Sequence, residues 1–163
     1  MSVLLHFCQW LYDSPIGTSI RESTYTFPII ETVHVLGITL LVGTISILDL
    51  RLLGLILKRE PVSDVARQIL PLTWIGFAVM FASGFLLFWS EAAKSYWNPA
   101  FRIKLILLLL VGLNPLIFHL TIYRRVEDWN LAPITPWRAR AAAIASLTLW
   151  SGIIIAGRAI AYF

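Results

Sequence analysis

The sequence predicts an all-α integral membrane protein: a four-helix transmembrane bundle preceded by a short N-terminal interfacial helix. Two observations indicate this fold. Of the 163 residues, 58% are hydrophobic and 13% are charged, whereas soluble chains average about 45–50% and about 25%. Four stretches, at 32–48, 68–90, 105–123 and 141–157, contain no Asp, Glu, Lys or Arg. Each is close to the ~20 residues that cross ~30 Å of hydrocarbon.

The same composition excludes several classes of function. A soluble domain of this size keeps a large share of its surface in water and cannot bury so much apolar area, so a cytosolic enzyme and a disordered segment are excluded. The pI near 9.6 is typical of nucleic-acid-binding domains, but the net charge is only +4. We interpret this charge as a signal of membrane orientation and expect no nucleic-acid partner. The single cysteine, Cys8, excludes a disulfide framework.

Residues 1–24 form the first of two predicted regions. They contain Asp13 and Arg21 and lack the long apolar core of a secretory signal peptide. Five apolar residues recur there at helical spacing: Leu4, Leu5, Phe7, Trp10 and Leu11. This spacing predicts a short helix lying in the plane of the membrane interface; the alternative is a frayed tail.

The second region, 25–163, holds the four transmembrane helices, which we place at about 27–57, 68–90, 100–123 and 139–162. The first is too long for a perpendicular crossing, so we expect it to tilt or to leave the membrane near Asp49 and Arg51. Short connections should make neighbouring helices antiparallel. Small residues are expected where helices pack in lipid, and the second helix carries such a stripe: Thr73, Gly76, Met80, Ser83 and Gly84.

Basic residues predict the orientation. The connections at 58–67 and 124–140 contain seven Lys or Arg residues, whereas the N-terminal region and the 91–99 connection contain Arg21 and Lys94. The positive-inside rule places the two basic connections in the cytoplasm. Both termini then face the periplasm of a bacterial inner membrane. The lipid bilayer is the expected partner, and a membrane protein complex or a homo-oligomer remains open.

Ionisable side chains inside a bilayer are costly and mark candidate functional sites. At 3.6 residues per turn, Glu31, His34 and Asp49 return to one helix face, which we expect to look into the bundle. Arg51 points nearly opposite, toward lipid phosphates or a partner. Comparison of depths predicts two polar layers. The outer one contains Glu31, His34, Arg102, Lys104 and Arg158, and the cytoplasmic one contains Asp49, Asn114 and His119.

Imidazole suits iron and other transition metals, so His34 is the candidate haem or metal ligand. His119 lies about nineteen residues into the third helix, or ~28 Å from its outer end, and this depth excludes it from the same iron. Lys104, His6 or a water molecule is an easier second ligand for His34. The alternative is structural: His34 can hydrogen-bond between helices, and Glu31 can pair with Lys104 or Arg158.

Several runs of residues resemble an uncharacterised family of small four-helix bacterial inner-membrane proteins. They are PIIETVHVLG at 28–37, VGT at 42–44, DLRLLG at 49–54, NPAFRIK at 98–104, SLTLW at 146–150 and GRAIAY at 157–162. This resemblance covers nearly the whole chain. It implies the topology and no activity.

A second resemblance indicates a possible function. His34 followed by the run at 41–43 is similar to the first helix of CopD-type copper-resistance membrane proteins and of HemJ-type protoporphyrinogen oxidases. The oxidase type implies haem b, with His34 as axial ligand and Lys104 as second ligand or propionate partner. In this interpretation Arg102 and Arg158 neutralise the propionates, and Glu31 orients the imidazole.

These observations predict a small integral membrane protein that binds haem b or a metal in an outer-half cavity and has a redox role. The alternative is a non-enzymatic accessory, assembly or transport subunit of a membrane complex.

Overall fold

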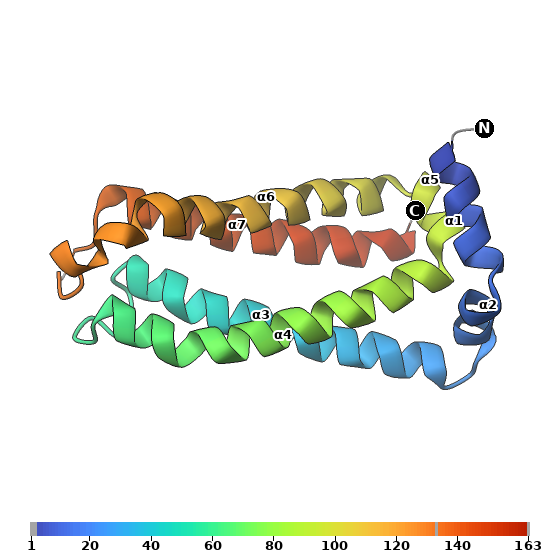
Figure 1. Ribbon diagram of the computed structural model, residues 1–163, viewed down its shortest axis with the longest axis horizontal. Helices are drawn as coiled ribbons and strands as arrows, with labels where there is room; N and C mark the ends of the chain where they lie inside the picture. Colours follow the sequence, from blue (N-terminus) through green and yellow to red (C-terminus); the bar gives the residue numbers. More distant parts are fainter. Residues whose placement is uncertain (1–2, 133, 163) are drawn as a thin grey trace.

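The computed structural model describes residues 3–132 and 134–162. Within them, four helices are long and apolar enough to span a membrane. These are α3 (Thr26–Leu52), α4 (Val62–Ser90), α6 (Pro99–Thr121) and α7 (Trp137–Ala159), with a 3₁₀ turn, η2 (Ile160–Tyr162), after α7. The predicted four-helix transmembrane bundle is confirmed (Figure 1).

The bundle consists of two antiparallel helical hairpins. Helix α3 packs along α4, α6 packs along α7, and contacts between α3 and α7 join the two pairs. Packing therefore runs in the order α4–α3–α7–α6, and α4 and α6 are not among the pairs that pack extensively. We call the end with α1 (Val3–Asp13), α2 (Pro15–Glu22) and α5 (Ala92–Trp97) the α1 end, and the end with the α3–α4 and α6–α7 connections the loop end (Figure 1).

Two short helices precede the bundle, α1 (Val3–Asp13) and α2 (Pro15–Glu22), and a third, α5 (Ala92–Trp97), links α4 to α6. The helix predicted near the N-terminus is thus present and is packed rather than frayed. Cys8 and Leu11 of α1 are buried against Ala92 of α5, and this burial raises the pKa of the Cys8 thiol. Helix α5 lies where the sequence predicted only a connection.

Two helix boundaries differ from the prediction by five residues or more. Helix α3 ends at Leu52, about five residues early, because Gly54 adopts a φ of 72° and its N–H bonds to the Arg51 carbonyl at 3.0 Å. Helix α4 begins at Val62, earlier than the predicted 68. Its first N–H groups are satisfied from the distant α6–α7 connection: Val62 donates to the Asn130 carbonyl at 3.2 Å, and Ser63 to the Asn130 side-chain oxygen at 2.9 Å.

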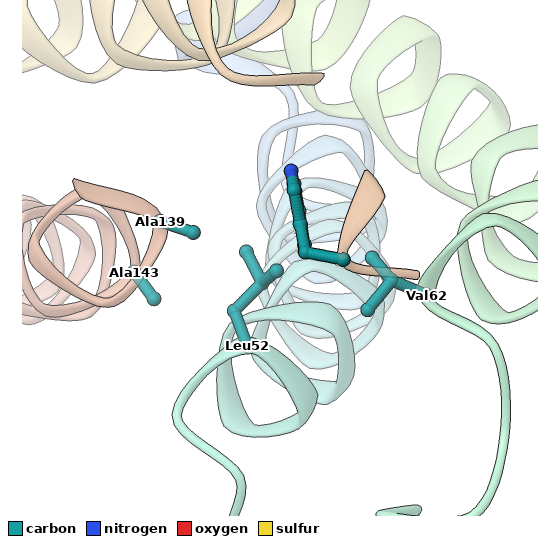
Figure 2. Packing of buried hydrophobic residues seen from close by; sticks show 5 residues of the cluster. Leu52, Val62, Ala139 and Ala143 are labelled. Carbon is teal, nitrogen blue, oxygen red and sulfur yellow. The ribbon is translucent and has the colours of Figure 1, made fainter. Parts of the chain in front are cut away.

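A hydrophobic cluster closes the loop end. Figure 2 shows Leu52 of α3 between Val62 of α4 on one side and Ala139 and Ala143 of α7 on the other. Val62 and Ala139 are fully buried, and Trp129 from the α6–α7 connection completes the cluster. This end of the molecule therefore holds both hairpins together.

The α3–α4 crossing is close enough for backbone contact. A Cβ atom added to Gly76 would lie 2.8 Å from the Leu41 backbone nitrogen, and one added to Gly37 would lie 2.9 Å from that of Met80. The Thr73 hydroxyl donates to the Thr44 hydroxyl at 3.0 Å across the same contact. The small-residue stripe predicted for the second helix is confirmed as a packing face.

Candidate functional site

His34 lies on α3 beside α4 and is 8% exposed. Its Nδ1 atom is 3.1 Å from the Met80 carbonyl oxygen and 3.0 Å from the Ser83 hydroxyl. The Ser83 hydroxyl donates its own proton to the Val79 carbonyl, so both neighbours of Nδ1 act as acceptors. Nδ1 therefore carries the proton, and Nε2 keeps an unprotonated lone pair. The structure records no hydrogen bond to Nε2 from the residues it describes.

A glycine on α4 makes room for this ring. A Cβ atom added to Gly84 would lie 2.9 Å from Cε1 of His34. The α4 backbone can thus approach the imidazole closely enough for Met80 and Ser83 to bind Nδ1. The sequence placed these residues on the packing stripe without connecting them to the histidine.

Lys104 is the second polar group in this part of the bundle. It is half-buried on α6, and a Cβ atom added to Gly157 of α7 would lie 3.7 Å from its Nζ atom. His34 on α3 thus belongs to the first hairpin and Lys104 on α6 to the second. That the two side chains share one outer cavity stays a prediction.

The other three residues of the predicted outer layer are exposed rather than buried with His34. Glu31 is exposed, so its predicted role of orienting the imidazole is wrong: the Met80 carbonyl occupies that position. Figure 1 gives the reason, because α4 crosses α3 and the two helices separate toward the α1 end. Arg102 is exposed and donates to the Tyr96 carbonyl at 2.9 and 3.1 Å. Arg158 is exposed on α7.

Two residues of the predicted cytoplasmic layer do come together. Asp49 is 6% exposed and interacts with the Ser146 hydroxyl, and Asn114 donates its side-chain N–H to the Ala142 carbonyl at 3.0 Å. Asp49 and Asn114 line one cavity of about 440 Å³. His119 does not join them. It is exposed at the end of α6 and stacks on Tyr123, with ring centroids 5.3 Å apart.

Arg51 is the buried residue whose role the sequence did not reveal. It is fully buried, and its Nε and Nη2 atoms donate to the Glu60 carbonyl at 2.9 and 2.7 Å. The expectation that it reaches lipid phosphates is wrong. Arg51 instead fastens the α3–α4 connection to the end of α3. The acceptor is a backbone carbonyl, and every residue has one, so the sequence could not predict this contact.

In the part of the chain that the structure describes, no group of three or more His, Cys, Asp or Glu residues is placed to hold a metal ion. The candidate site consists of the His34 imidazole on α3 and the Lys104 side chain on α6.

The comparisons with known proteins add a family. The chain matches the model described as a family of unknown function (DUF6644) over residues 9–163. No curated protein and no solved structure matches the chain. These findings agree with the resemblance to an uncharacterised family. They show no likeness to CopD-type or HemJ-type proteins.

Proposed function

This chain belongs to DUF6644, a family of unknown function, and from the geometry around His34 we propose that it is a haem b-binding membrane protein with a redox role. The observation that carries the proposal is the state of the imidazole. Nδ1 donates to a backbone carbonyl and Nε2 has no partner among the described residues. Metal-ligating histidines usually have this arrangement, because the bond from one nitrogen fixes the ring and the tautomer for the other.

The surrounding residues fit such a cofactor in part. Lys104, from the facing hairpin, is a candidate for the second ligand or a propionate partner. Arg158 is exposed and able to pair with a propionate, whereas Arg102 is held by the Tyr96 carbonyl. Haem iron supplies one-electron redox chemistry when it is bound. The role of the protein is to orient the imidazole of His34 and to exclude water from it.

An absorption spectrum tests the proposal. We expect the full-length protein, expressed with ample haem and purified in detergent, to show a Soret band. His34→Ala should remove most of that band, because the imidazole nitrogen that would bind the iron is lost. His119→Ala is the matched control and should leave the band nearly intact, since His119 is exposed and stacked on Tyr123. A colourless wild-type protein, or equal losses in the two variants, would contradict the proposal.

One observation favours a second candidate, a non-enzymatic accessory, assembly or transport subunit. Nδ1 of His34 already has two partners on α4, which is sufficient for a structural role at the α3–α4 crossing. In that case no Soret band is present in any variant. His34→Ala would then lower the free energy of unfolding by only about 1 kcal/mol, the usual scale for an interhelical hydrogen bond in membranes.

We also propose an orientation, with both termini in the periplasm and the loop end in the cytoplasm. Its support is the excess of Lys and Arg in the two connections at the loop end. An alkaline phosphatase fused after residue 163 should be active, and the same enzyme inserted between residues 58 and 59 should be inactive. The reverse pattern would overturn the orientation while leaving the bundle unchanged.

A further inference from the structure

The cavity beside Asp49 is not lined by His34 or Lys104, although Met80, the partner of His34, belongs to its wall. Its volume is about 440 Å³, within the range of small-molecule pockets. All four long helices line it, mostly with apolar side chains, among them Leu41, Leu108 and Trp150. Asp49 is the only residue in this lining with a formal charge.

The cavity lies where the bundle is open to lipid. Helices α4 and α6 are not among the pairs that pack extensively, yet both contribute to its wall. Trp74 of α4 is 66% exposed, and Gly112 of α6 is also exposed. A molecule can therefore reach the cavity sideways from the bilayer, between α4 and α6.

The buried polar atom of the wall that lacks a partner is an acceptor. The Asp49 carboxylate is an acceptor when ionised, and its Oδ2 atom is buried with no hydrogen-bond partner among the described residues. Nearby donors already have acceptors: one N–H of the Asn114 amide donates to the Ala142 carbonyl, and Ser146 interacts with Asp49. The Thr73 hydroxyl lies within reach of the Thr44 hydroxyl and the Ile69 carbonyl. A complementary ligand must supply a donor, and a positive one, because a buried carboxylate is costly unless it is paired.

We propose that this cavity binds lipophilic amines, with the protonated amine at Asp49 and the apolar body along Leu41, Leu108 and Trp150. Charge complementarity selects the cation, since the lining offers a carboxylate and no positive group. A bare metal ion is not the occupant that fits, because Asp49 has no second acidic, histidine or cysteine side chain in the wall. The site stands independently of the haem proposal.

Two glycines provide a matched pair of positions for testing whether the amine occupies the cavity. A Cβ atom added to Gly112 would meet no atom within 4 Å, and the same is true of Gly43. Only Gly112 belongs to the cavity wall. A leucine at 112 should therefore occupy the entrance without forcing the helices apart, whereas a leucine at 43 adds the same bulk elsewhere.

Quenching of tryptophan fluorescence provides the measurement, because Trp74 and Trp150 line the cavity. The probes are 11-bromoundecylamine and the neutral 11-bromoundecanol, added to the full-length protein in neutral detergent near pH 7. We expect the amine to reach half-quenching at a concentration about tenfold or more below that of the alcohol, as a charge-assisted hydrogen bond implies. Asp49→Asn should abolish this preference. Asp64→Asn, which removes an exposed carboxylate paired with Arg67, should retain it.

Gly112→Leu tests the cavity without touching Asp49. It should raise the half-quenching concentration of the amine severalfold, and Gly43→Leu should not. Equal quenching by amine and alcohol in the wild type would assign the cavity to neutral lipid chains and overturn the proposal. So would a preference that survives Asp49→Asn, or a half-quenching concentration of the amine that Gly112→Leu leaves unchanged. A dimer that excludes both probes and dissociates in Gly112→Leu would show that a second copy of the chain fills the cavity instead.

Discussion

Gly76→Leu is expected to open the α3–α4 hairpin and to lower the free energy of unfolding in detergent by about 3 kcal/mol, the upper end of the usual cost of overpacking. The Cβ atom would lie 2.8 Å from the backbone nitrogen of Leu41 and 3.0 Å from its Cα atom. Backbone atoms inside a helix cannot rotate away as the end of a flexible side chain can. The helices must therefore separate, and the Thr44–Thr73 hydrogen bond at the same contact is lost with them.

Gly43→Leu is the control for this experiment, because a Cβ atom at Gly43 meets nothing within 4 Å. Replacing a helical glycine there should be neutral or slightly stabilising, by up to about 1 kcal/mol. Equilibrium unfolding in mixed micelles, followed by circular dichroism, measures both variants. Equal stability of the two variants would mean that α3 and α4 do not cross at Gly76.

Arg51→Ala is expected to have the second large effect, a loss of about 3 kcal/mol of unfolding free energy. The change removes two charge-assisted hydrogen bonds to the Glu60 carbonyl and leaves a void where a fully buried side chain stood. Arg51→Met should recover part of the loss, because it fills the volume without burying a charge. The Nη1 atom supports this expectation, since it is buried with no hydrogen-bond partner among the described residues.

The matched control is Arg67→Ala. Arg67 is exposed and pairs with Asp64 at 3.0 Å, and exposed ion pairs of this kind contribute about 0–1 kcal/mol. The same unfolding titration compares the three variants, and limited proteolysis between residues 53 and 61 reports whether that connection is released. Arg51→Ala and Arg67→Ala curves that coincide would show that Arg51 does not fasten the connection.

The transmembrane helices could be predicted because the bilayer penalises every charge, so that charge-free stretches mark the spans directly. Their ends depended on contacts that no local pattern contains. Helix α4 starts at Val62 because Asn130, far along the chain, accepts hydrogen bonds from its first N–H groups. Helix α3 stops at Leu52 because Gly54 leaves helical geometry.

The candidate site, like the helices, could be predicted only in part. Depth alone placed His34 and Lys104 in one outer layer, and their meeting there stays a prediction. The prediction that Glu31 faces into the bundle was wrong. A separation of three residues places Glu31 and His34 on one face of α3, but it does not show how far along α3 the crossing helix α4 covers that face. The partner of His34 is the Met80 carbonyl. Every residue has a backbone carbonyl, so the sequence could not predict which one accepts this hydrogen bond.

The contact between the α6–α7 connection and the first hairpin has a consequence for biosynthesis. Asn130 caps the start of α4, and the Thr135 hydroxyl donates to the Leu52 carbonyl at the end of α3. When α4 emerges from the ribosome, these two residues have still to emerge behind it. The first hairpin therefore lacks these partners at its loop end until the chain has been released beyond residue 135. A chain truncated before Asn130 would keep α3 and α4 but not the contacts that close their loop end.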